Sequence, residues 1–167
     1  MTALVLGIDP GAVSGFAVVT MEAAPRLVKH DFIRLDAGEI PSLVTNGIEY
    51  LIQRRIAAMV IESQFVAKNI KTAIRLAQFA GRWEEACIAT FPDIPVQWVK
   101  PNEWQTAMLA GAMGGGRAKR EQRKAAAISI CLARWKVKLE TDVADAALIA
   151  AFVAERMAFE KRIKGKR

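Results

Sequence analysis

The amino-terminal stretch Ala3-Leu-Val-Leu-Gly-Ile-Asp9-Pro-Gly-Ala-Val-Ser-Gly15-Phe-Ala-Val-Val-Thr20 decides the fold of this chain. Its first six residues are an apolar run that predicts a buried strand ending at Asp9. Asp9-Pro-Gly is typical of a turn. Residues 14–20 predict a second strand, close enough to the first to form a hairpin with it.

The apolar pattern after this hairpin switches between strand and helix. From Ile40 to Arg55 apolar residues recur at steps of three and four, which predicts a helix with one buried face. The remaining expected elements are strands at 26–35, 57–61 and 95–99, helices at 69–90, 118–133 and 143–159, and a short helical turn from Pro101 around Trp104.

The order of these elements predicts an α/β protein. Three leading antiparallel strands and two later parallel ones form a mixed five-stranded sheet with helices on both faces. This is the order of the ribonuclease H-like fold. We expect a single domain over residues 1–160, followed by a frayed basic tail at 161–167.

The predicted helix 69–90 carries two apolar stripes. One contains Ala73, Leu76, Ala77, Ala80 and Cys87, and the other contains Phe79, Trp83 and Ala86. Such a helix can pack on the sheet and still offer a face to a second copy of the chain. The alternative is a helix buried within one subunit.

Charge is distributed unevenly along the 167 residues, whose net charge is +7. Residues 117–167 hold fourteen of the 24 basic residues and six of the 17 acidic ones, so the rest of the chain is nearly neutral. A basic carboxyl-terminal third favours a polyanionic partner, most simply nucleic acid. The alternative is a solvated charged face.

Histidine and cysteine are scarce: His30, Cys87 and Cys131 are the only three. They cannot build a Cys/His zinc site, and they leave a single histidine for a catalytic triad. Two distant cysteines fit a reducing compartment, and no apolar run reaches the ~18 residues of a membrane span. We therefore expect a cytoplasmic protein that binds no membrane and no organic cofactor.

Two buried strands are predicted to end in a carboxylate, at Asp9 and at Glu62. A third acidic pair, Asp142 and Asp145, shares one face of the last helix. Each residue has a simpler explanation, since a strand can exit into solvent at an acid. Asp142 as N-cap and Asp145 at the third helical position would likewise stabilise a helix start.

Together, four acids that converge at one end of a sheet predict a site for Mg²⁺, or Mn²⁺ as its substitute, because both ions prefer oxygen ligands. Two such ions ~4 Å apart can hold both the attacking and the leaving oxygen of a phosphodiester displacement.

Three segments resemble RuvC-type Holliday-junction resolvases, in the family's order: Gly7-Ile-Asp9-Pro-Gly-Ala-Val-Ser-Gly15, Val60-Ile-Glu62-Ser-Gln-Phe65 with Lys68-Asn69, and Asp142-Val-Ala-Asp145-Ala-Ala-Leu-Ile-Ala. The resemblance spans residues 4 to about 153. It implies Mg²⁺-dependent resolution of four-way DNA junctions in recombination and repair, by a homodimer that nicks two strands symmetrically.

The resemblance also implies roles for individual residues. The ligands of two Mg²⁺ ions would be Asp9, Glu62, Asp142 and Asp145. Phe65, next to Lys68, would stack on an unpaired base at the branch point; its alternative is a packing role over helix 69–90. A basic residue near the active site would come from Lys119, the nearest match, or from Arg120, Arg123 and Lys124.

The chain departs from the family pattern at Trp104, where a lysine usually precedes the Gln-Thr pair, and in a long glycine-rich loop at 110–117. Three alternatives remain open at this point. One is a sugar-kinase or actin-like ATPase, although a single domain is too little for its two-domain cleft. Another is a ribonuclease H-like nuclease acting on other branched DNA or on RNA. The third is a structure-selective DNA-binding module without catalysis.

Overall fold

A computed structural model describes residues 2–36, 41, 56–63, 69–112 and 119–165. Its centre is the expected mixed sheet of five strands, in the order β3-β2-β1-β4-β5. The strands are β1 (Leu4–Asp9), β2 (Val13–Thr20), β3 (Leu27–Arg34), β4 (Ile56–Glu62) and β5 (Val96–Val99). The first three pair antiparallel, whereas β4 and β5 run parallel to β1.

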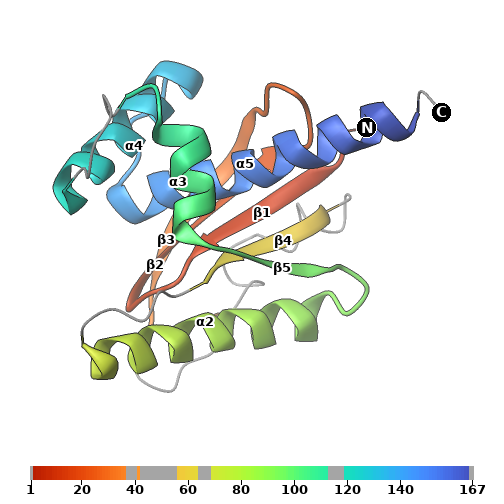
Figure 1. The fold of residues 1–167 in the computed structure, drawn as a ribbon. Coiled ribbons are helices and arrows are strands. Elements are labelled where there is room, and N and C mark those ends of the chain that lie inside the picture. Colours follow the sequence, from red (N-terminus) through yellow and green to blue (C-terminus); the bar gives the residue numbers. More distant parts are fainter. Residues whose placement is uncertain (1, 37–40, 42–55, 64–68, 113–118, 166–167) are drawn as a thin grey trace.

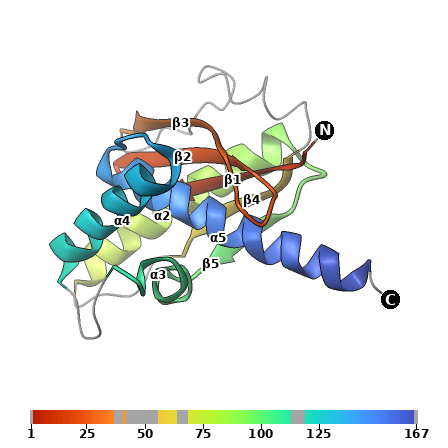
Figure 2. The same cartoon turned by 90° about the horizontal axis from the view of Figure 1, so that it is seen from above.

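Helices cover both faces of this sheet, as the sequence predicts (Figure 1). Helix α2 (Ile70–Thr90) lies on one face. On the other lie α5 (Thr141–Lys164), α3 (Pro101–Leu109) and α4 (Arg120–Trp135). Figure 2 shows the last turns of α5 extending past the sheet. None of the helices in the described part of the chain is long and apolar enough to cross a membrane.

The sheet separates two apolar cores because neighbouring residues of a strand face opposite ways. Val5 of β1 packs toward α5, whereas Leu6 and Ile8 pack toward α2. Helix α5 is apolar around most of its circumference since it lies between the sheet and the pair α3 and α4.

Two glycines bring α5 onto the strands. A Cβ atom at Gly7 would overlap Ala146 and Ala150, and one at Gly15 would overlap the backbone of Asp142. The first turn of α5 therefore lies directly on the hairpin of β1 and β2.

Several expectations need correction. The two predicted stripes of α2 merge into one buried face, which includes Phe79, Ala80 and Trp83, while Ala77 is exposed. The helical turn around Trp104 is a helix of nine residues. Helix α5 continues to Lys164, so residues 161–164 are helical and not a frayed tail.

The amino-terminal end of α5 also differs from the prediction. Its N-cap is Glu140, so neither Asp142 nor Asp145 has the predicted capping position. Both aspartates lie within the helix, where their side chains are free for other contacts. The predicted helix 40–55 and most of the glycine-rich loop lie outside the described residues.

Candidate metal centre and active site

Asp9 and Glu62 come together because β1 and β4 are parallel neighbours. Ile8 pairs with Ile61, so the next residue of each strand reaches the same edge of the sheet. The carboxyl ends of parallel strands are where open α/β sheets form their binding sites. Asp9 and Glu62 therefore lie side by side at the carboxyl ends of β1 and β4.

Asp142 and Asp145 reach the same edge through Gly15. This glycine pairs with Asp9 across the hairpin, and the backbone of Asp142 occupies the space that a side chain at position 15 would fill. Asp145 is one helical turn further along α5 and shares the face of Asp142. Because Gly15 has no side chain, α5 can lie against the hairpin and bring Asp142 and Asp145 close to Asp9.

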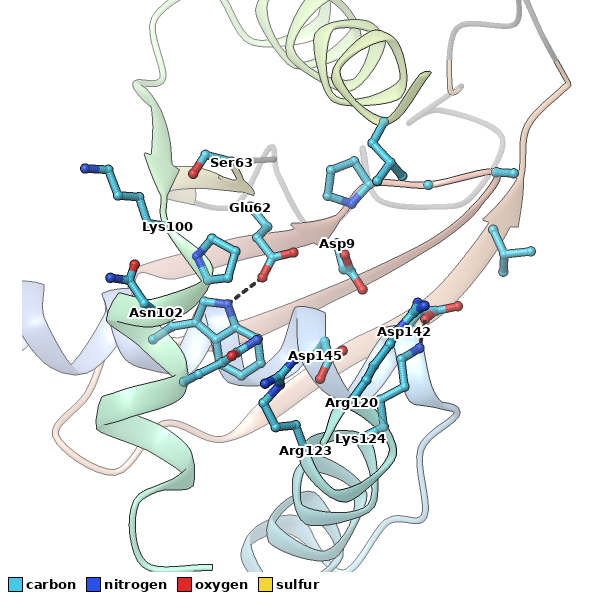
Figure 3. Close-up of a pocket in the computed structure, with 18 residues that line it drawn as sticks. Asp9, Glu62, Ser63, Lys100, Asn102, Arg120, Arg123, Lys124, Asp142 and Asp145 are labelled. Atoms are coloured by element: carbon cyan, nitrogen blue, oxygen red, sulfur yellow. Dashed lines mark hydrogen bonds and ion pairs between the residues drawn. The ribbon is translucent and has the colours of Figure 1, made fainter. Parts of the chain in front are cut away.

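These four carboxylates line one cavity of about 1100 Å³ (Figure 3). Figure 3 shows Asp9 and Glu62 projecting from the sheet toward Asp145 and Asp142 on α5. The wall on the other side consists of side chains from α4 and from the start of α3. These are Lys100, Asn102, Trp104, Gln105, Arg120, Arg123 and Lys124.

Burial raises the pKa of three of these acids, and neighbouring carboxylates add to the effect at Asp9 and Asp145. For Asp9 burial is the largest cause, followed by the carboxylates of Glu62, Asp145 and Asp142, and its pKa lies well above the usual range. Burial and then Glu62 raise the pKa of Asp145 to about 7. Burial also raises the pKa of Glu62, against hydrogen bonds with Trp104 and Asp9 that lower it. Such a cluster favours bound cations.

Two of the acids have a specific partner from the opposite wall. The indole Nε1–H of Trp104 donates a hydrogen bond to Glu62 Oε1 (2.7 Å). Lys124 Nζ forms an ion pair with Asp142 Oδ1 (3.0 Å), with each side chain about one-third exposed. One acid thus has a neutral partner and the other a cationic one.

Only some of the basic residues expected near the site line the cavity. Arg120, Arg123 and Lys124 line the cavity, whereas Lys119 precedes α4 and is absent from its wall. The backbone N–H of Lys119 donates to Gln122 Oε1 (2.7 Å). Phe65 and Lys68 lie outside the described residues.

Sequence reasoning missed the contribution of α3. Lys100, Asn102, Trp104 and Gln105 all line the cavity, whereas the sequence marks Trp104 only as a departure from the family pattern. A signal was present: Pro101 lies two residues after the end of a strand and favours the first position of a helix. A helix that begins at Pro101 has its first turn beside the end of β4, the strand that pairs with β5.

The donor set fits a divalent metal ion of the Mg²⁺ type, because all four candidate ligands are carboxylates with oxygen donors. Among the described residues, however, no three acidic, histidine or cysteine side chains are placed so that one ion could bind them all. Lys124 occupies one oxygen of Asp142, and Trp104 occupies one oxygen of Glu62, so each carboxylate keeps a second oxygen for an ion. The oxygen donors therefore suit a divalent ion, around which the acids would draw closer together.

A family model described as "Crossover junction endodeoxyribonuclease RuvC" matches residues 5–153, which include all four acids. The chain belongs to the RuvC family. Proteins of this family are metal-dependent nucleases of DNA recombination and repair.

Curated relatives of the RuvC family match most of the chain. The crossover junction endodeoxyribonuclease RuvC of Moorella thermoacetica is 34% identical over 168 residues, with 96% of each chain covered. That of Alkalilimnicola ehrlichii is 36% identical over 124 residues, covering 71% of this chain and 72% of the relative.

Solved structures show the same RuvC-type, ribonuclease H-like fold. Thermus thermophilus RuvC in complex with a Holliday junction has a TM-score of 0.68 at 23% identity, covering 95% of this chain and 96% of that chain. The fowlpox virus Holliday junction resolvase has a TM-score of 0.52 at 13% identity, covering 92% and 99%. The fold persists where the sequences have diverged widely.

Proposed function

We propose that this chain resolves four-way DNA junctions by Mg²⁺-dependent hydrolysis of phosphodiester bonds. The observation that carries the proposal is the convergence of four carboxylates, from β1, β4 and α5, in one cavity with a basic wall. The RuvC-family relatives named as crossover junction endodeoxyribonucleases support the same activity.

The candidate ligands for two ions are Asp9, Glu62, Asp142 and Asp145. Bound there, the ions would lower the pKa of an attacking water and offset the charge that develops on the phosphate. Mg²⁺ suits the site because it keeps several waters and needs few protein ligands. Mn²⁺ has the same ligand preference and is the expected substitute.

The basic side chains of the cavity have a distinct task, which is to bind and orient the DNA backbone. Arg120 and Arg123 on α4 lie across the cavity from Lys100, which precedes α3. A phosphate entering between these walls meets cations on both sides. Lys124 compensates the charge of Asp142 and would compete with an ion for that carboxylate.

The proposal includes Phe65 and Lys68 as further DNA contacts at the branch point. It rests for these two on the resemblance alone, since both lie outside the described residues. Lys119 remains a candidate for contacts along the DNA outside the cavity.

We further propose that the chain acts as a homodimer through α2. Three isoleucines on the helix face away from the core are largely exposed: Ile70 (67%), Ile74 (55%) and Ile88 (51%). Ile74, Gly81 and Ile88 are spaced by sevens, and a Cβ atom at Gly81 would meet nothing within 4 Å. A second α2 can approach closely there, and a two-fold dimer matches a substrate cut on two strands.

A cytoplasmic location is part of the proposal. Both Cys87 and Cys131 are buried free thiols, which suits a reducing compartment. Burial raises the pKa of both thiols to about 12, so neither is a reactive nucleophile at neutral pH.

Replacing Asp9 by asparagine tests the activity. Losing a charged metal ligand forfeits several kcal/mol of transition-state stabilisation, so we expect the single-turnover cleavage rate of Asp9→Asn to fall roughly 100-fold or more. Junction affinity, measured without cleavage in EDTA, should change little because it comes mainly from phosphate contacts by lysine and arginine.

The matched control is Asp93→Asn, an exposed aspartate before β5 that is not among the residues lining the cavity. It should cut like the parent. An Asp9→Asn protein that cuts at the parental rate in saturating Mg²⁺ contradicts the proposed site. Parallel assays with four-way, three-way, duplex and RNA–DNA substrates separate junction resolution from a broader nuclease activity. A parent protein that binds junctions without cutting them indicates a binding module.

A further inference from the structure

The short connection between β5 and α3 places Trp104 beside the end of β4. Glu62 pairs with Val99 at the last position of the two parallel strands. Lys100 is then the N-cap of α3, and Pro101 occupies its first position. One turn of helix later, Trp104 lies beside Glu62 although the two are 42 residues apart in the sequence.

Trp104 is held firmly enough to orient another side chain. It is only 1% exposed and belongs to the apolar core that includes Val99, Leu109 and Val143. A buried indole has one donor and no acceptor, and here that donor is used on Glu62 Oε1 at 2.7 Å. The indole cannot turn away without leaving its packing.

The contact selects which oxygen of Glu62 remains available. Oε1 accepts the hydrogen bond from Trp104, and the carboxylate faces Asp9 in the cavity (Figure 3). A glutamate side chain has several rotatable bonds, and fixing it before binding reduces the entropy lost on binding.

The charge of the partner matters as much as its position. The indole is uncharged, unlike Lys124, which forms an ion pair with Asp142. The neutral indole N–H orients the carboxylate and leaves its negative charge in place.

We propose that Trp104 is a positioning residue that holds Glu62 ready to bind the divalent ion. This inference rests on the proposed function, in which Glu62 is a metal ligand. Trp104 itself contacts neither the ion nor the DNA backbone in this role.

Trp104→Phe tests the inference, because phenylalanine keeps an aromatic ring in the core and removes the donor. Hydrogen bonds to charged groups are the stronger ones, so we expect roughly tenfold weaker Mn²⁺ binding by calorimetry without DNA. The Mg²⁺ concentration for half-maximal cleavage should rise by a similar factor, while junction affinity in EDTA stays parental.

The matched control is Trp98→Phe. Trp98 Nε1 also donates to a carboxylate, Glu84 Oε1 at 2.9 Å, but at a half-exposed place outside the cavity. This variant should bind Mn²⁺ and cut like the parent. If Trp104→Phe binds Mn²⁺ with parental affinity and needs no more Mg²⁺ for cleavage than the parent protein, the inference is overturned.

A measurement on the parent protein covers the case in which Trp104→Phe fails to fold. The indole N–H resonance of Trp104 should shift during a Mg²⁺ titration, while the resonance of Trp98 stays in place. A Trp104 resonance that ignores Mg²⁺ overturns the inference.

Glu62→Gln separates this outcome from failure of the proposed function. If Glu62→Gln loses cleavage while Trp104→Phe keeps the parental Mn²⁺ affinity and cleavage, only the positioning role of Trp104 is wrong. If Glu62→Gln cuts like the parent, the proposed metal site itself is wrong.

Discussion

Asp145 faces Glu62 and Asp142 in the cavity, with Lys124 and Arg120 as the cations that act on it. Burial, and then Glu62, raise its pKa from the ordinary value of 3.8 to about 7. Burial and neighbouring carboxylates also raise the pKa of Asp9. A carboxyl whose pKa is higher in the folded than in the unfolded chain stabilises the fold while it is protonated. That stabilisation is lost as the pH rises through the folded pKa.

We therefore predict that the metal-free protein loses stability between about pH 4 and pH 7, the interval between the ordinary and the raised pKa of Asp145. Its Tm, measured by differential scanning calorimetry in EDTA, should be several degrees lower at pH 8 than at pH 5. Mg²⁺ should raise Tm more at pH 8, because ionised carboxylates bind the ion and protonated ones do not.

Asp145→Asn is the control for this pH dependence. It removes one titrating group, so the decline in Tm should be shallower than in the parent. A Tm that is insensitive to pH over this range, or a Mg²⁺ effect that is larger at pH 5, contradicts the assignment of raised pKa values to this cluster.

At the scale of elements, the contact between α5 and the β1–β2 hairpin decides the geometry of the cavity. Gly15 allows the backbone of Asp142 to lie against the strand, and Gly7 does the same for Ala146 one turn further along. A stripe of alanines on α5 completes this close approach. Any side chain at these glycines pushes the helix, and with it both aspartates, away from Asp9.

We predict that Gly15→Ala lowers the free energy of unfolding by about 1–3 kcal/mol, the usual effect of overpacking a core. Because the displaced segment carries Asp142, Mn²⁺ affinity should fall as well. Urea unfolding and calorimetry measure the two effects. Gly111→Ala is the control, since a Cβ atom there meets nothing within 4 Å. Parental stability and Mn²⁺ affinity in Gly15→Ala would show that the first turn of α5 is not held in this way.

On the scale of the whole molecule, the cavity and the exposed face of α2 are separate surfaces. The cavity opens at one edge of the sheet between β1, β4 and the helices α3, α4 and α5, and of α2 only Leu76 reaches it, not the exposed isoleucines. Helix α2 covers the opposite face of the sheet and presents its isoleucines outward. Two copies joined through α2 would keep both cavities accessible to one branched substrate.

We predict that Ile74→Asp converts the proposed dimer to a monomer, because a charge on each copy would be buried at the proposed two-fold contact. Sedimentation equilibrium measures the change, and Tm of the monomer should stay close to parental since Ile74 is 55% exposed. Junctions should then receive single nicks in place of paired cuts.

Leu132→Asp is the matched control, an apolar residue on α4 with 47% exposure. It should remain dimeric. If the parent protein is monomeric at micromolar concentration, or if Ile74→Asp remains dimeric, α2 is not the contact.

The order of strands and helices was readable from the sequence because apolar periodicity is a local signal. The uninterrupted runs before Asp9 and Glu62 predicted two neighbouring strand ends, and the structure brings these acids together with Asp142 and Asp145. Local patterns failed where several helix starts were possible: capping by Asp142 was plausible on sequence, but α5 begins at Thr141 with Glu140 as its N-cap.

Sequence alone determined the mixed sheet and the helices on both faces and predicted which four acids form the site, because apolar periodicity and an acid at the end of an apolar run are both local signals. Only the tertiary structure decided that Gly15 seats α5, that Trp104 holds Glu62 and that Lys124 pairs with Asp142. Such contacts join segments far apart in the chain, and their side-chain geometry depends on how whole elements pack against one another.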